Sequence, residues 1–142
     1  MNESFRIPGP EKVETLRSHA VSLYSKLREE RKVTHPDDLT TDDSEMTELA
    51  YEKWLAAEDN RIIKGPSEED KTTFYEVQLS KDLFFVDAGF TDPEFLETPV
   101  LFMLRSTLEL ARKNRAPLEM IEKIKSQIVL VQDLIDQQKP QD

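Results

Sequence analysis

The sequence predicts an all-α fold: an up-and-down helical bundle of four longer helices plus a short helical turn, centred on a C-terminal helical hairpin. Three observations lead to this prediction. The chain has only 3 glycines in 142 residues, which disfavours a turn-rich sheet. Glu, Lys, Leu and Gln, which are good helix formers, are abundant. All 8 prolines and all 3 glycines fall in proposed breaks or at first-turn positions, so none interrupts a proposed long helix.

Length and composition limit the size of the core. A chain of 142 residues fits one domain, 1–142, for which we expect short flexible termini at about 1–9 and 138–142. The apolar share is 37% and the charged share is 34%. Compared with ordinary globular proteins, these values predict a thin core under a heavily charged surface.

The first helix is expected from Glu11 to about Lys32. Its apolar residues share one narrow stripe, which predicts packing along one side. They are Val13, Leu16, Ala20, Leu23, Tyr24 and Leu27. Residues 33–41 contain His35-Pro36 and polar turn residues, so a loop is expected there.

The second helix is expected to run to about Glu58. Thr41, Asp42 or Asp43 can provide its N-cap, because each has a side-chain oxygen that can accept a backbone hydrogen bond. The residues predicted for its inner face are Met46, Leu49, Ala50, Trp54 and Ala57.

The third helix is expected to begin after Ser67, a good N-cap that precedes three acidic residues. Gly89 is predicted to end it in the left-handed conformation. The segment Thr91–Glu94 then has the pattern of a cap and first turn, which predicts the short helical turn.

Part of this third segment is ambiguous. Tyr75, Val77 and Leu79 alternate with their neighbours as a strand would, and a strand pair here would change the class to α+β. We favour a helix. The residues predicted to point inward are Phe74, Val77 and Phe84.

The C-terminal hairpin is expected between Thr98 and Gln138. Thr98 is predicted as the N-cap of its first helix, with Pro99 at the first helical position. After a break at 114–116, Pro117 starts the second helix. The first stripe consists of Val100, Met103, Leu104, Thr107, Leu108, Leu110 and Ala111. The second consists of Ile121, Ile124, Ile128, Val131 and Ile135, and the two are expected to face each other.

Some apolar residues fall outside these stripes. Phe102 lies in the polar half of its helix, and Val129 and Leu130 lie beside the last stripe. Either other helices cover them or another subunit does. We therefore predict an interaction surface on the hairpin that supports a homodimer or a protein partner. The surface is predicted to include the only notable cationic run, Arg112, Lys113 and Arg115, as a docking patch for an acidic partner. The alternative is that these residues only complement the dipole at a helix C-terminus.

Charge and residue types exclude several functions. The net charge of −10 disfavours binding to nucleic acid or to an anionic membrane, since both require cationic surface. The chain has no cysteine, only 2 histidines and no run of apolar residues long enough to cross a membrane. These features suit a cytoplasmic protein. They identify no catalytic, cofactor-binding or metal-ligating residue, and no cofactor is predicted.

The leading functional hypothesis is a non-enzymatic interaction or regulatory protein. The first alternative is an enzyme or small-ligand binder with an apolar pocket between helices. Its expected lining is Trp54, Tyr75, Phe84 and Phe85, with Phe102 nearby. The second alternative is an acidic mimic of nucleic acid, suggested by the many carboxylates in 37–59.

Overall fold

A computed structural model describes residues 10–61 and 68–139. Helices account for all regular structure in these residues, which confirms the all-α class. The five long helices are α1 (Pro10–Arg31), α2 (Thr41–Arg61), α3 (Glu68–Asp82), α6 (Leu101–Lys113) and α7 (Leu118–Gln137). The overall prediction counted four longer helices, but the ranges expected for them, with two helices in the hairpin, correspond to these five. The predicted flexible ends and the predicted cap at Ser67 lie largely outside the described residues.

Four short elements connect the long helices. They are the 3₁₀ turn η2 (Pro36–Asp38), α4 (Phe84–Asp87), α5 (Pro93–Phe95) and the π-helical turn η3 (Leu96–Val100). Among the described helices, none is both long and apolar enough to cross a membrane.

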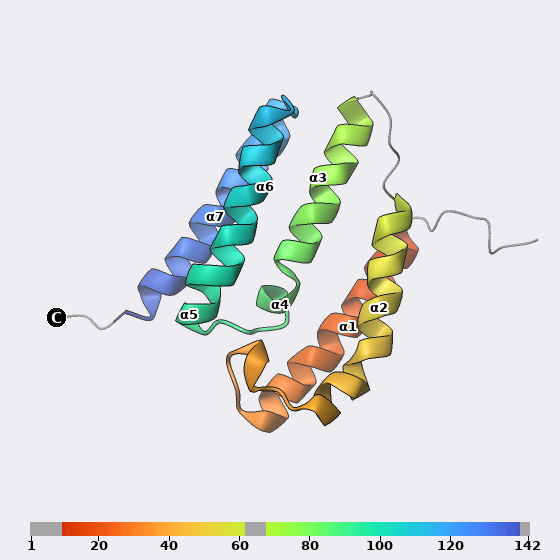
Figure 1. The fold of residues 1–142 in the computed structure, drawn as a ribbon, viewed down its shortest axis with the longest axis vertical. Helices are drawn as coiled ribbons and strands as arrows, with labels where there is room; N and C mark the ends of the chain where they lie inside the picture. The colour runs from red at the N-terminus through yellow and green to blue at the C-terminus, as the bar shows by residue number, and fades with distance from the viewer. Residues whose placement is uncertain (1–9, 62–67, 140–142) are drawn as a thin grey trace, which may run out of the picture.

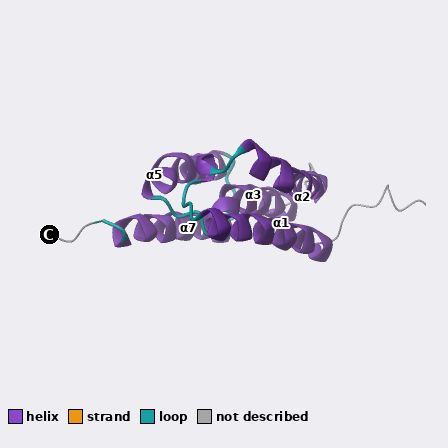
Figure 2. Cartoon of the chain, turned by 90° about the horizontal axis from the view of Figure 1, so that it is seen from below, coloured by secondary structure: helices purple, strands orange, loops and turns teal. Residues whose placement is uncertain are grey.

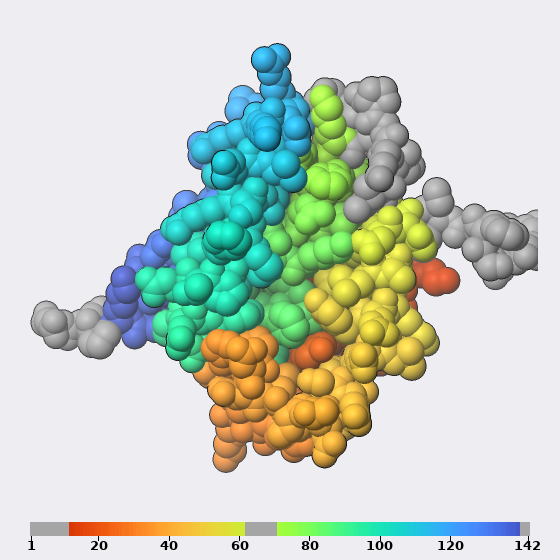
Figure 3. Space-filling model, in the orientation of Figure 1, coloured from red at the N-terminus to blue at the C-terminus, as the bar shows by residue number. Residues whose placement is uncertain are grey.

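Two helical hairpins flank α3 (Figure 1). One is α1–α2 and the other is α6–α7, and α3 contacts α2, α6 and α7. The central helix is therefore α3, whereas the C-terminal hairpin forms one side of the bundle. Side chains of α3 are packed between those of α2 and α6 on the face shown in Figure 3. From below, α1 and α7 lie along the same edge of the molecule (Figure 2).

The segment that could have been a strand is helical. Val77 and Phe84 are buried and Phe74 is half-buried, as predicted. The helix does not continue to Gly89, because it breaks at Leu83 before the single turn of α4. Gly89 has a φ of 95°, and the Phe90 N–H bonds the Phe85 carbonyl oxygen at 3.0 Å, a pattern that commonly ends helices.

The predicted start of α6 is wrong. Asp92 provides the cap, because its Oδ1 accepts from the Glu94 N–H at 2.9 Å and from the Phe95 N–H at 3.4 Å. Helical backbone then continues from α5 through η3 into α6. Pro99 lies inside η3, where it would interrupt regular α-helical bonding. The wider π turn accommodates it, and the Leu101 N–H bonds back to Leu96.

The start and inner face of α2 also differ from prediction. Thr40, one residue earlier than expected, exchanges hydrogen bonds with Asp43, each 3.1 Å long. Met46 and Leu49 are 66% and 63% exposed and so do not belong to the inner face. The buried residues of α2 are Asp43, Thr47, Trp54, Ala57 and Glu58. Periodicity misplaced this face because polar residues with local partners occupy much of it.

Candidate interaction groove

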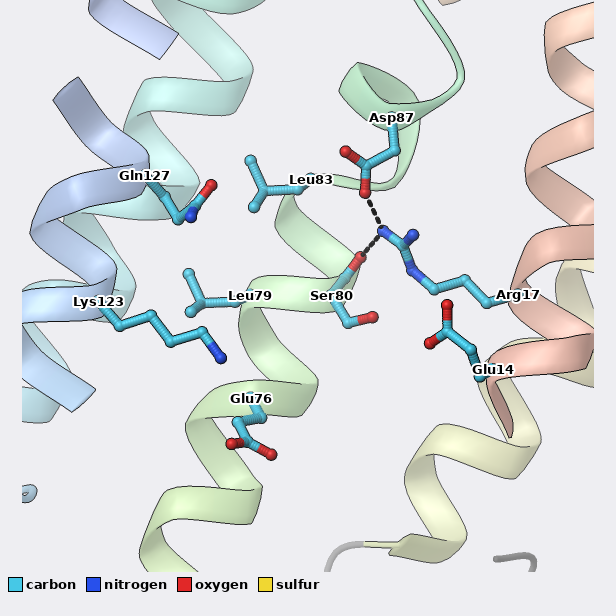
Figure 4. A pocket seen from close by; sticks show the side chains of 9 residues that line it. All are labelled: Glu14, Arg17, Glu76, Leu79, Ser80, Leu83, Asp87, Lys123 and Gln127. Atoms are coloured by element: carbon cyan, nitrogen blue, oxygen red, sulfur yellow. Dashed lines mark hydrogen bonds and ion pairs between the residues drawn. The ribbon is translucent and has the colours of Figure 1, made fainter. Parts of the chain in front are cut away.

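A cavity of about 300 Å³ lies over α3, between α1 and α7. Figure 4 shows α3 as its floor, with side chains from α1 on one side and from α7 on the other. Asp87 of α4 closes one end of this view. The lining residues are Glu14, Arg17, Glu76, Leu79, Ser80, Leu83, Asp87, Lys123 and Gln127.

Two further cavities adjoin this one along α7. A cavity of about 220 Å³ shares Glu76 and Lys123 with it and reaches Pro117. On the other side, a cavity of about 310 Å³ shares Leu83, Asp87 and Gln127 with it and reaches Gln137. We call the three cavities together the α1–α7 groove. It follows the full length of α7, about 30 Å at 1.5 Å per residue.

The groove has an apolar strip along its floor and its α7 wall. Leu79 is buried, while Leu83, Val86 and Leu134 are half-buried. Leu130 is 56% exposed and completes the strip opposite α4. Large apolar side chains that face an open hollow in this way are typical of surfaces that bind another molecule.

Carboxylates outnumber cations around the groove. Its acidic lining residues are Glu14, Glu76, Asp87, Glu119 and Asp133, and its basic ones are Arg17 and Lys123. Arg17 is already engaged within the chain. One of its terminal nitrogens donates to the Ser80 carbonyl oxygen at 2.9 Å and to Asp87 at 2.8 Å, as Figure 4 shows. The acidic excess is therefore the charge that a ligand would meet.

Two arginines of α1 hold α4, which forms part of the groove. Arg17 bonds Asp87, the last residue of α4, and the Arg28 Nε donates to the Ala88 carbonyl oxygen at 3.0 Å. The Arg28 guanidinium also lies directly over Gly89, so closely that a Cβ there would collide with it. The positive φ of Gly89 is what favours glycine here, since the end of the Arg28 side chain could move away from a Cβ by giving up its bond to Ala88. The width of the groove near α4 thus depends on α1.

The predicted interaction residues separate into three places. Leu130 lies in the groove. Phe102 and Val129 are 71% and 57% exposed, and neither lines any of the three groove cavities. The basic residues Arg112, Lys113 and Arg115 are exposed at the end of α6 and in the turn before α7.

The residues predicted to line an apolar pocket also separate. Trp54 and Phe84 stack with ring centroids 4.7 Å apart, and Phe85 meets Phe84 edge-on at 5.1 Å. These rings fill the space between their helices with one another. Tyr75 packs elsewhere on α3, where its hydroxyl donates to the Leu110 carbonyl oxygen at 3.3 Å.

Three buried carboxylates have structural partners. Glu58 accepts from the Trp54 indole N–H at 3.1 Å and pairs with Arg61 at 3.3 Å. The Nε and one terminal nitrogen of Arg31 donate three hydrogen bonds to Asp43. Together with the bond from the Thr40 backbone N–H, they lower the pKa of Asp43 to about 2. Burial raises the pKa of Asp82, and the hydroxyl of Thr107 donates to it at 2.7 Å. Within 10–61 and 68–139, no group of three or more His, Asp or Glu side chains is placed to hold a metal ion.

Sequence reasoning missed the groove because its lining comes from four separate elements. Glu14, Ser80 and Lys123 look like ordinary polar helix positions until the helices are placed together.

Comparison of the chain with known protein families, with curated proteins and with solved structures found no match. Function is therefore inferred from the geometry of the groove.

Proposed function

We propose that this protein is a non-enzymatic interaction protein that binds a helix of another protein in the α1–α7 groove. The observation that supports this most directly is the continuity of the three cavities along α7, with apolar side chains beneath and charged side chains at the edges. Binding of an amphipathic helix in a hydrophobic groove is a recurring mode of protein recognition. The compartment we propose is the cytoplasm.

The spacing of the apolar strip fits a helical occupant. Leu79, Leu83 and Val86 follow one another at intervals of four and three residues along α3 and α4. Leu130 and Leu134 are four residues apart on α7. Helices pack by placing ridges with these spacings into the grooves of a neighbour. A helix laid between α1 and α7 would cover α3 from its open side.

Two polar side chains at or near the groove have structural partners, which supports a structural role for them. Arg17 bonds Asp87 and Ser80, and Glu58 bonds Trp54. Arg17 joins α1 to α3 and α4, and the Ser80 hydroxyl donates to Glu58 at 3.5 Å, which joins α3 to α2. These bonds fix the α1 wall of the groove on its floor.

A homodimer through the outer face of the α6–α7 hairpin is the second candidate. The exposure of Phe102 and Val129 favours it. In the groove itself a second copy is a poor occupant, because each copy has a net charge of −10 and carboxylates outnumber cations among the residues that line the groove.

The test uses nuclear magnetic resonance with the full chain and a synthetic amphipathic helix of about 18 residues, long enough to follow most of the groove. The peptide has a leucine face and a neutral glutamine face. We expect its addition to shift the amide signals of Leu83, Val86 and Leu134. Leu130→Glu should abolish these shifts. Val129→Glu is the matched control, because Val129 is similarly exposed on the adjacent position and does not line the groove cavities.

The two candidates predict opposite patterns. Groove binding requires that Leu130→Glu, and not Val129→Glu, removes the response. If the protein dimerises through the outer face instead, Val129→Glu or Phe102→Glu will halve the mass measured by light scattering. Leu130 shares a further cavity of about 510 Å³ with Val129, so Phe102→Glu is the variant that affects the outer face alone. Peptide shifts confined to signals of Phe102 and Val129 would reject the groove.

A further inference from the structure

We infer that the partner helix is cationic: an amphipathic helix with an apolar face for the groove floor and Lys or Arg along its edges. This inference rests on the proposed function, since it specifies the chemistry of the occupant of the same groove. The evidence for it is that the groove has both an apolar floor and acidic residues along its edges. Either feature alone would not select a cationic amphipathic helix.

Acidic residues are distributed along the whole groove. Glu119 lines the cavity nearest the start of α7, Glu14 and Glu76 line the middle one, and Asp133 lines the far one. Their spread along the groove suits a row of basic side chains one or two turns apart on a helix. Among the charged lining residues, only Lys123 and Arg17 are basic.

The middle of the groove is where the acidic edge is best defined. Glu14 is exposed on the α1 side, and Glu76 is partly exposed on the floor, where it forms a long ion pair with Arg61 at 4.0 Å. Asp87 is offset by Arg17 at 2.8 Å. Glu14 and Glu76 are therefore the carboxylates that a basic side chain of the partner would meet next to Leu79.

The two edges of the groove differ in charge, so the bound helix is expected to prefer one orientation. The α1 edge has Glu14, whereas the central part of the α7 edge has Lys123. In Figure 4 these two residues lie on opposite sides of α3. A helix with basic residues beside α1 and near Glu119 and Asp133, and with a neutral or acidic one opposite Lys123, would meet complementary charge on both sides.

The experiment compares three peptides with the same leucine face and with Lys, Gln or Glu on the polar face, titrated into the full chain by fluorescence anisotropy. Exposed ion pairs are individually weak, so two of them should make the Lys-faced peptide bind about fivefold more tightly than the Gln-faced one at low salt. The Glu-faced peptide should bind most weakly. Salt at about 1 M, where charges are screened beyond about 3 Å, should abolish the difference.

A pair of matched double variants separates local from overall attraction. Glu14→Gln with Glu76→Gln removes two carboxylates from the groove, whereas Glu45→Gln with Glu109→Gln removes two exposed carboxylates of α2 and α6 that line none of the groove cavities. The first pair should reduce the fivefold preference to less than about twofold, and the second should leave it nearly intact.

Each outcome decides one claim. If both double variants reduce the preference for the Lys-faced peptide equally, only the overall charge of the protein attracts the peptide, and the inference is overturned. Equal binding of the Lys-faced and Gln-faced peptides, both lost in Leu130→Glu, overturns the cationic partner and leaves the groove function standing. Failure of all three peptides to bind overturns the proposed function as well.

Discussion

The α1–α2 hairpin meets α3 and α4 through aromatic rings and ion pairs, whereas the α6–α7 hairpin is packed mainly by aliphatic side chains. On the first side, Trp54 stacks on Phe84 and the Arg17 guanidinium lies 5.5 Å from the Trp54 ring. On the second side, Leu104, Ile124 and Ile135 are fully buried.

The difference shows two ways of fixing a helix on the same central helix. The burial of aliphatic side chains depends little on their direction, so helices packed by such side chains tolerate small rotations. Rings and buried charges require particular partners at particular distances, because an unpartnered polar group costs free energy in the interior. The α1–α2 side is therefore expected to be the more sensitive to conservative polar changes, and the α6–α7 side to the introduction of charge.

The largest effect is expected from Ile124→Glu on the aliphatic side. Ile124 is fully buried, so the change places an unpaired charge in the core and should unfold the domain. Circular dichroism would show loss of most helical signal. Leu130→Glu, at an exposed position of the same helix, should retain it; unfolding of this variant would mean that Leu130 belongs to the core.

The second prediction concerns the aromatic side. Phe84→Ala should lower the free energy of unfolding by about 3–5 kcal/mol, because Phe84 is fully buried against Trp54 and Tyr24. Phe102→Ala removes the same ring from an exposed position and should change it by less than about 0.5 kcal/mol. Urea denaturation measures both. Similar losses in the two variants would contradict the described packing.

The third prediction tests an ion pair of the α1–α2 side by pH. The pKa of Asp43 is about 2 in the folded protein, below its ordinary value of 3.8. Its carboxylate therefore contributes to stability above pH 4. That contribution should decline as the pH falls from about 4 toward 2. The urea midpoint of the wild type should exceed that of Asp43→Asn at pH 6, and the gap should narrow at pH 2.5. A gap independent of pH would exclude the Arg31–Asp43 pair as its source.

The smallest effect is expected where α3 meets α6. Burial raises the pKa of Asp82, so the charged form opposes folding at neutral pH, and this cost disappears as the pH falls below its ordinary pKa. Asp82→Asn retains an acceptor for Thr107 without the charge. It should slightly raise the thermal midpoint at pH 7 relative to the wild type, and the advantage should shrink at acid pH. A lower midpoint at pH 7 would show that the charge itself is needed for the bond to Thr107.

The same contrast explains what could be predicted from the sequence. The stripe of α7 was correct for Ile124, Val131 and Ile135, because aliphatic residues at helical spacing have few other uses. The inner face of α2 was misplaced at Met46 and Leu49. The buried face of α2 includes Glu58 and Asp43, which have polar partners. In the sequence, such charged residues resemble a solvent-exposed face.

The groove could not have been predicted from helical periodicity. Glu14 and Lys123 are brought to opposite sides of α3 by the angles at which three helices pack, and a single sequence carries no direct signal of those angles. Leu130 was recognised as an apolar residue outside the main stripe. Its neighbours across the groove, Leu83 and Val86, become apparent only in three dimensions.

The π turn at 96–100 takes up one extra residue without turning the helix on either side of it. A π turn has one residue more than the α-helical turn it replaces, so the helical segments before and after it keep nearly the same rotation about the axis. Phe95 and Leu96 before α6 and Leu101 at its start are therefore all buried. Deletion of the exposed Thr98 should preserve this register but place Pro99 in a regular α-helical turn, which a proline ring interrupts. The extra residue and the proline are therefore expected to depend on each other.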